Sequence, residues 1–197
     1  MSKKLYFIIA GVVENNTLKH SLIGAYDTLE KAVERYKEYV KREINKLTDT
    51  DAGIMDDLCN PEHMSIEFEE LGYHDYSFDF GTIRIVPLEI NDTDKYITIY
   101  SFNDTDISYG YPLTIEIVGT YSEKDKAKET MYNFLKEHHY CDFAADEDGT
   151  PLTDEEIDAL FGEDSKSDGE IWETSLYYPE LEETHMHCAS VEEFMVE

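Results

Sequence analysis

Apolar residues recur every three or four positions between residues 29 and 47. This stripe consists of Leu29, Val33, Tyr36, Val40, Ile44 and Leu47. Its periodicity predicts an amphipathic helix whose apolar side packs on a sheet. A second stripe, made of Ala127, Met131, Phe134 and Leu135, predicts a matching helix. The outer faces of both helices mix Glu with Lys and Arg, which is typical of solvated helices supported by pairs three and four positions apart.

The chain contains an internal match around these two helices. Residues 22–32 align with residues 117–127 at an offset of 95, and Gly, Tyr, Lys and Ala recur. In both copies an apolar pair precedes the glycine, and a capping residue follows the tyrosine. Asp27 and Ser122 are the predicted N-caps, each with an acid three positions later that can reach back to the cap. Each copy is therefore predicted to contain a strand, a short turn and a capped helix.

The match extends in both directions from this segment. Leu5–Gly11 and Tyr96–Ser101 are predicted as first strands, residues 50–58 and 153–160 as short helices, and Phe80–Pro87 and Trp172–Pro179 as last strands. In the second short helix, Thr153 and Glu156 have the spacing of a capping box. The proline that ends each last strand suits a strand terminus, because proline cannot donate to the ladder.

These elements predict an α+β fold built by tandem duplication of a strand–strand–helix–short helix–strand unit. Each unit has an antiparallel or mixed sheet with its helices on one face. The predicted boundaries are residues 1–92 for the first unit, 93–184 for the second and 185–197 for an acidic C-terminal tail. The alternative is chance similarity between short hairpin–helix segments.

The net charge of the chain says more about its function than any sequence motif does. The 197 residues include 45 acidic and 16 basic ones, a net charge of −29. Residues 142–197 hold nineteen acids and one base, a net −18. Direct binding to DNA or RNA phosphates is disfavoured because it requires clustered Lys and Arg, and anionic membrane surfaces are disfavoured for the same reason. Apolar and aromatic residues run through the acidic region, which predicts that this region folds.

The acidic region has the spacing needed to imitate nucleic acid. Carboxylates two apart on a strand, or three or four apart on a helix, lie about 5–7 Å from one another, close to the separation of successive phosphates. Such a surface would associate quickly, and in a salt-sensitive way, with a basic cleft. The candidate partner-binding residues are Asp146, Glu147, Asp148, Asp154, Glu155, Asp158, Glu163, Asp164, Glu170, Glu180, Glu182 and Glu183. The earlier pair Glu67 and Glu69 has similar spacing.

In size, charge and lack of a catalytic motif, the chain resembles the small acidic anti-defence proteins of phages and mobile elements. These are anti-restriction and anti-CRISPR proteins that occupy the nucleic-acid groove of a host nuclease. The resemblance is one of class, and no site residue is carried over from it. It implies a non-enzymatic inhibitor whose partner is a basic nucleic-acid-binding protein, such as a nuclease or CRISPR effector. The alternatives are an acidic adaptor or scaffold for another protein partner and, third, an enzyme with or without a zinc requirement.

Candidate metal chemistry is confined to two clusters and one loop. His138, His139 and Cys141 form one cluster, and His185, His187 and Cys188 form the other. Imidazole and thiolate suit Zn²⁺, but the spacing matches no zinc signature. Residues 146–155 resemble a calcium loop, yet Ala144 stands where its first acidic ligand is required, so an Asp-Gly turn explains them better. No cofactor or metal is predicted, and no phosphate loop or nucleophile motif occurs.

The cysteine pattern and the hydropathy of the chain indicate a compartment. The three cysteines are an odd set without tight spacing, which favours free thiols in a reducing cytosol. The apolar run at residues 5–13 has no cleavage site after it and is predicted as a strand. No apolar stretch approaches the roughly 20 residues of a membrane span. We therefore expect a cytoplasmic protein.

Overall fold

The computed structural model describes residues 2–14, 17–46, 59–78, 81–104, 113–138, 150, 153, 155–156, 171–178 and 183–197. In chain order the elements are β1 (Ser2–Glu14), β2 (Thr17–Tyr26), α1 (Leu29–Lys46), α3 (Pro61–Glu70), β3 (His74–Phe78), β4 (Gly81–Asn91), β5 (Tyr96–Asp104), β6 (Thr114–Tyr121), α4 (Lys124–His138), β7 (Ile171–Tyr178) and β8 (Glu183–Glu193). The fold is α+β, as predicted.

The strands form two four-stranded sheets with the same internal order. The first sheet has the order β2-β1-β4-β3 and the second has the order β6-β5-β8-β7. Every pairing between these named strands is antiparallel. Adding four to each strand label converts the first order into the second. The two sheets therefore correspond strand by strand.

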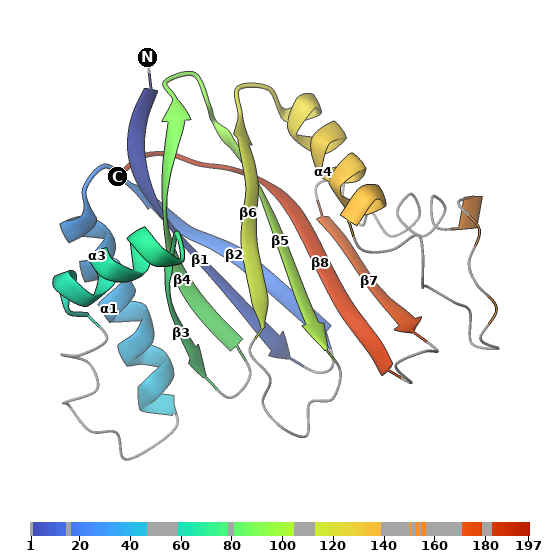
Figure 1. Cartoon of the computed structure of the whole chain (residues 1–197), viewed down its shortest axis with the longest axis horizontal. Coiled ribbons are helices and arrows are strands. Elements are labelled where there is room, and N and C mark those ends of the chain that lie inside the picture. The colour runs from blue at the N-terminus through green and yellow to red at the C-terminus, as the bar shows by residue number, and fades with distance from the viewer. Residues whose placement is uncertain are drawn as a thin grey trace.

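The sheets pack face to face, and each carries its helices on the outer face, giving four layers (Figure 1). Side chains alternate across β1, because successive residues of a strand point to opposite faces. Phe7 and Ile9 face inward and pack with Ile97 and Ile99 of β5. Ile8 lies among the residues that α1 covers. The inner core is thus the layer that joins the two halves of the chain.

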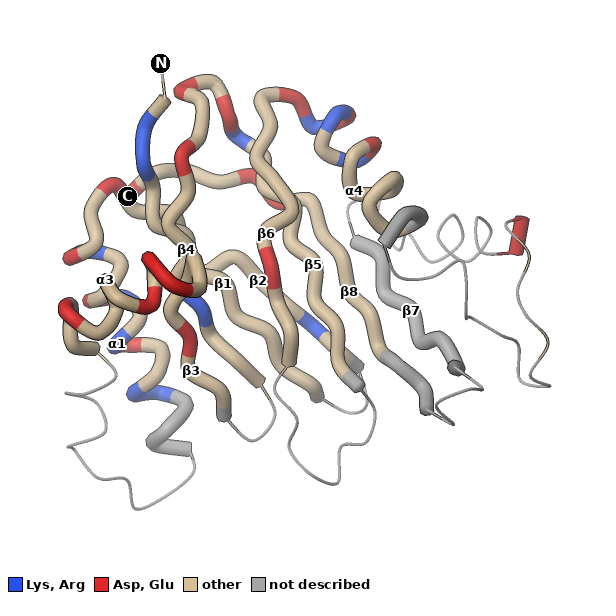
Figure 2. The backbone as a smooth tube through the Cα atoms, in the orientation of Figure 1, with Lys and Arg blue, Asp and Glu red and all other residues tan. Residues whose placement is uncertain are grey.

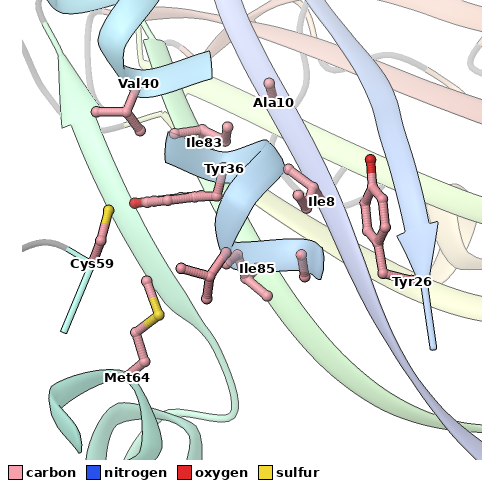
Figure 3. Packing of buried hydrophobic residues seen from close by; sticks show 11 residues of the cluster. Ile8, Ala10, Tyr26, Tyr36, Val40, Cys59, Met64, Ile83 and Ile85 are labelled. Carbon is pink, nitrogen blue, oxygen red and sulfur yellow. The ribbon is translucent and has the colours of Figure 1, made fainter. Parts of the chain in front are cut away.

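The predicted apolar stripes face the sheets. Val33, Tyr36 and Val40 of α1 are buried against Ile83 and Ile85 of β4 (Figure 3). On the second sheet the buried residues of α4 are Ala127, Met131 and Leu135. The last two positions of the first stripe, Ile44 and Leu47, lie outside the described side chains.

The N-caps differ from the prediction by one residue. α1 begins at Leu29, and its cap is Thr28, whose hydroxyl accepts from the backbone N–H of Lys31 at 3.4 Å. Asp27 instead forms an ion pair with Lys31 at 2.9 Å. α4 begins at Lys124, which places the cap at Glu123 instead of Ser122. A short polar run offers several oxygens to the same helix end, so the sequence does not decide between neighbours.

The recurring Gly-x-Tyr motif marks the same irregularity in both sheets. The β1–β2 register shifts beside Gly24, and the β5–β6 register shifts beside Gly119. A Cβ on Gly24 would lie 2.5 Å from the Tyr26 hydroxyl, and one on Gly119 would lie 2.6 Å from the Tyr121 hydroxyl. Each tyrosine ring therefore lies where a side chain on the glycine would be. Duplication of the unit stays a prediction, but these positions show why the two segments share their residues.

Several predictions about the strands are wrong. Each sheet has four strands, one more than the predicted unit. Phe80–Pro87 falls mainly in β4, an inner strand, whereas Trp172–Pro179 falls mainly in β7, an edge strand, so the two are not equivalent. Pro87 also lies within β4 and does not end it, because β4 continues to Asn91. The counterpart of β4 is β8, which pairs with both β5 and β7.

The predicted acidic tail at residues 185–197 is mostly strand β8. After β8, Phe194 packs in the inner core, with its ring edge-on to Phe7 at 5.1 Å. Val196 forms a parallel bridge with Ala25 of β2, and the N–H of Glu197 donates to the Ala25 carbonyl at 2.9 Å. The C-terminal segment therefore joins the second sheet to the first.

Candidate functional site

Few of the predicted acidic site residues fall within the described part of the chain. Glu155 is exposed in a helical segment. Glu183 begins β8, but its side chain is not described. The remaining ten lie outside the described residues: Asp146, Glu147, Asp148, Asp154, Asp158, Glu163, Asp164, Glu170, Glu180 and Glu182. A continuous ridge formed by these carboxylates stays a prediction.

The capping box beside Glu155 is confirmed. The Glu156 carboxylate accepts from the backbone N–H of Thr153 and from its hydroxyl, both at 2.8 Å. In return, the Glu156 N–H donates to the Thr153 hydroxyl oxygen at 3.3 Å. This reciprocal arrangement satisfies N–H groups that a helix start leaves without intrahelical partners. It fixes where the predicted acidic short helix begins.

The described helix α3 carries a concentration of acid that lies outside the predicted region. Its sequence, PEHMSIEFEE, contains four glutamates and no Lys or Arg. Figure 2 shows acidic positions along α3, whereas α1 carries both signs. Sequence reasoning placed a short helix at residues 50–58, which lie outside the described residues, and missed α3. It also paired Glu67 with Glu69 at strand spacing, which is wrong because both lie on this helix, where residues two apart do not face each other.

The boundaries of α3 follow from local chemistry. The Asn60 side chain accepts from the N–H of Glu62 at 2.9 Å, and Pro61 occupies the first turn. At the other end, the N–H of Leu71 donates to the Glu67 carbonyl, and Gly72 has a φ of +80°. A glycine with positive φ is the commonest residue just after a helix. The Asn-Pro pair and this glycine are the signals that could have found the helix.

A polar cluster lies between the two sheets. The His20 side chain of β2 contacts two hydroxyls of the opposite sheet: Ser101 at 2.6 Å through Nδ1, and Ser190 at 2.7 Å through Nε2. The Ser190 hydroxyl donates to Glu192 at 3.1 Å. Glu192 in turn accepts from the N–H of Leu22 on β2 at 3.2 Å.

The proton positions in this cluster follow from counting donors. Ser190 has one hydroxyl proton and gives it to Glu192, so His20 is assigned an N–H at Nε2, which donates to Ser190. Nδ1 then accepts the 2.6 Å bond from Ser101, which is shorter than the alternative bond of the same hydroxyl to the Cys188 carbonyl at 3.4 Å. Burial lowers the pKa of His20 from 6.5 to about 3, so His20 is neutral at pH 7. Burial also raises the pKa of Glu192, while its bonds from Leu22 and Ser190 act in the opposite direction.

This chain of groups contains the residue types of a Ser–His–Glu hydrolase site. In such a site the histidine accepts the proton of a serine that attacks the substrate. Here Ser101 is fully buried and Ser190 is 4% exposed. Neither hydroxyl is placed to meet a substrate, and both bridge to a histidine of the opposite sheet. The arrangement accounts for sheet docking and for pairing of buried polar groups.

Arg84 makes a comparable contact at the other edge of the sandwich. From β4 its guanidinium donates to the carbonyl of Ile115 on β6, in the opposite sheet, and to Asp75 at 2.8 Å. The ring of Tyr73 lies 3.6 Å from the guanidinium carbon. Both β2 and β6 are edge strands. Glu192 thus binds a backbone N–H of β2, and Arg84 binds a backbone carbonyl of β6, each from the facing sheet. Such contacts restrict the pairing of these edge strands with other chains.

The two candidate zinc clusters are constrained by strand geometry. His187 and Cys188 are adjacent on β8 and therefore point to opposite faces. His187 Nδ1 lies 3.0 Å from the Tyr100 hydroxyl on the α4 side. Cys188 packs in the inter-sheet layer, 4.0 Å from His20. The two side chains cannot bind one ion together. Within the described ranges no group of three potential ligands gathers, and the side chains of His138, His139, Cys141 and His185 are not described.

Two further buried polar side chains, Tyr36 and His74, lie near α3. The Tyr36 hydroxyl and His74 Nε2 are buried and make no hydrogen bond in the described structure. His74 Nδ1 contacts the Glu67 carboxylate of α3, and its ring lies 5.3 Å from that of Tyr36. Burial, followed by the nearby thiol of Cys59, raises the pKa of Tyr36. These groups fix α3 against the sheet.

Among the helices in the described ranges, none has both the length and the apolar character needed to cross a bilayer. Comparison of the chain with protein-family models, with curated proteins and with solved structures found no match.

Proposed function

We propose that this protein inhibits a nucleic-acid-binding host defence enzyme, without catalysing a reaction, by occupying its basic groove. The observation that carries the proposal is the net charge of −29, of which −18 lies in residues 142–197. Crowding of like charges costs self-repulsion in a folded protein. A surface that imitates phosphates would explain why this unfavourable charge is kept, because basic grooves that bind nucleic acid attract the same charge pattern.

The described structure supports this proposal in two ways. The acidic helix α3 is fixed by capping contacts at both ends and by packing on the first sheet. The inter-sheet contacts of His20 and Glu192 hold both halves of the chain together. A rigid acidic surface loses little conformational entropy on binding, which favours affinity.

Competition with DNA tests the proposal. Fluorescent duplex DNA is bound to each member of a panel of purified restriction nucleases and CRISPR effectors, and the protein is titrated in while anisotropy is followed. We expect displacement of DNA from at least one enzyme. The inhibition should weaken at least tenfold between about 50 and 200 mM salt, because many charges are paired. Binding that leaves the DNA in place would contradict the proposal and would favour the acidic adaptor alternative.

Charge reversal tests which surface is used. Replacing Glu155, Asp158, Glu180 and Glu182 with Lys should abolish displacement. The matched control carries the same change in net charge on α1 and just before its cap, through lysines at Asp27, Glu30, Glu34 and Glu38. Exposed ion pairs there contribute at most about 1 kcal/mol to stability, so the control should fold and still displace DNA. Inhibition that survives the first replacement would refute the choice of residues 142–197.

A further inference from the structure

Helix α3 and its C-cap carry exposed apolar side chains beside acid. Ile66, in the middle of the helix, is 53% exposed, and Leu71, at its C-cap, is 57% exposed. Within the described structure, the other exposed large apolar residues are Met195 and Val196 near the C-terminus. Single exposed apolar residues are common on protein surfaces. What distinguishes this pair is the chemistry around it.

Glutamates surround Ile66 at helical spacing. Glu62 is four positions before it, and Glu69 and Glu70 are three and four positions after it; all three are exposed. Residues so spaced on a helix have Cβ atoms about 5–6 Å apart. The result is an apolar centre with a carboxylate rim, and α3 has no Lys or Arg to neutralise that rim. Protein interfaces commonly have an apolar centre and a polar rim.

The opposite face of α3 is fixed to the first sheet. Met64 is fully buried there, and the Phe68 ring lies 6.4 Å from that of Tyr6. Glu67 contacts His74 of β3. The exposed face is therefore held in place before any partner arrives.

We propose that this face of α3 docks an amphipathic basic segment of the partner protein. Lys or Arg side chains of that segment bind Glu62, Glu69 and Glu70, and an apolar side chain between them covers Ile66. Leu71 extends the apolar contact at the C-terminal end of the helix. We infer a basic segment because its positive charge complements the glutamates of α3. A second copy of the chain would bring another net −29 against the glutamates, and nucleic acids and anionic membranes would be repelled. The inference rests on the proposed function and assigns it a contact surface outside residues 142–197.

Two synthetic peptides test the docking surface. Both carry the same number of Lys residues at helical spacing; one has Leu on its apolar face, and the other has Ser at those positions. Binding to the full-length protein is measured by calorimetry at two salt concentrations. We expect the Leu peptide to bind about tenfold more tightly, because burying one Leu is worth at least 1.4 kcal/mol.

Variants of α3 identify the contact. Ile66→Ser with Leu71→Ser should reduce the preference for the Leu peptide from about tenfold to under about threefold, a loss of at least about 0.7 kcal/mol. Glu62→Gln, Glu69→Gln and Glu70→Gln together should weaken both peptides and flatten the salt dependence. The matched control, Met195→Ser with Val196→Ser, removes the other exposed apolar pair and should leave the preference unchanged. Equal binding of both peptides, or an unchanged preference in the first variant, would overturn the inference.

The DNA competition assay separates this inference from the proposed function. If the Ile66/Leu71 variant loses the peptide preference and also displaces less DNA, both are supported. If the wild type prefers the Leu peptide through α3 but displaces no DNA, the docking surface stands and the proposed function fails. If both proteins displace DNA equally, the function stands and α3 is not its contact surface.

Discussion

His20 and Ser190 are joined by a 2.7 Å hydrogen bond across the two sheets, although 170 positions separate them in the chain. Their strands, β2 and β8, belong to different sheets. The bond forms only when the sheets are docked. It therefore couples the titration of one imidazole to the docking of the two halves.

The pH dependence of stability should report this coupling. The pKa of His20 is lowered from 6.5 to about 3 in the folded protein by burial. In that interval the unfolded chain binds a proton that the folded chain does not, so acid favours unfolding. As pH falls below about 6.5, this residue should remove up to about 1.4 kcal/mol of stability per pH unit. The free energy of unfolding should be measured in urea between about pH 7.5 and 5.5, a range that brackets the ordinary pKa of imidazole.

His20→Gln is the control for this measurement. Glutamine retains a donor and an acceptor but does not titrate, and the many carboxylates that also titrate are the same in both proteins. At pH 7.5 we expect the variant to be about 1–2 kcal/mol less stable. The difference should shrink as pH falls. Parallel stability curves for the two proteins would show that His20 is not held neutral by folding.

Phe194 should be an anchor for the first sheet. Its ring is 7% exposed and packs edge-on to Phe7. Phe194→Ala should cost about 3 kcal/mol, because it removes a buried ring and leaves a cavity. The neighbouring Met195 is 84% exposed, so Met195→Ala should change stability by less than about 0.5 kcal/mol. Similar losses in both variants, measured by denaturant unfolding, would mean that the C-terminal segment does not pack in the inner core.

Tyr36 and Tyr100 lie under the helices of their respective sheets, and their hydroxyls differ in bonding. The Tyr36 hydroxyl is buried and makes no hydrogen bond in the described structure, whereas the Tyr100 hydroxyl lies 3.0 Å from His187 Nδ1. Tyr36→Phe should be neutral or stabilise by about 1 kcal/mol, since it removes an unpaired buried group. Tyr100→Phe should destabilise by about 1 kcal/mol. Thermal unfolding of the two variants checks the order, and a reversed order would contradict the packing.

Gly24 should tolerate a side chain less well than Gly119. A Cβ on Gly24 would lie 2.8 Å or less from three atoms of Tyr26, which is almost fully buried. At Gly119 the corresponding contacts to Tyr121 are 2.6, 3.0 and 3.3 Å, and Tyr121 has partial solvent exposure that allows it to move. Gly24→Ala should cost about 1–3 kcal/mol through overpacking, and Gly119→Ala should cost less. Equal melting temperatures would argue against this account of the shared Gly-x-Tyr motif.

The elements that the sequence predicted well have strong periodic signals. The stripe that includes Val33, Tyr36 and Val40 identified α1, and the apolar run at residues 5–13 identified β1. β8 was missed because its inward-facing positions are mostly small or polar, including Cys188, Ser190 and Glu192. A strand that faces a polar inter-sheet cluster lacks the apolar alternation by which buried strands are recognised.

The candidate site was predicted less well than the fold. Ten of the twelve predicted acidic site residues lie outside the described residues. Beside them, the predicted capping box of Thr153 and Glu156 is confirmed. The acidic face of α3 was missed because, among the described side chains of that helix, Met64 is the one fully buried, so the helix has no long apolar stripe. The sequence signals that indicate this helix are the capping residues Asn60, Pro61 and Gly72.

The sequence alone determined the charge, the α+β class and the paired helices, because composition and periodicity are local properties. The tertiary structure decided that His20 meets Ser190, that residues 183–193 form an inner strand and that Ile66 stays exposed among glutamates. Each of these depends on which faces of distant segments are brought together. The spacing of residues along the chain does not predict which faces pack together, because the free energy of that packing comes from burial and hydrogen bonding between distant segments.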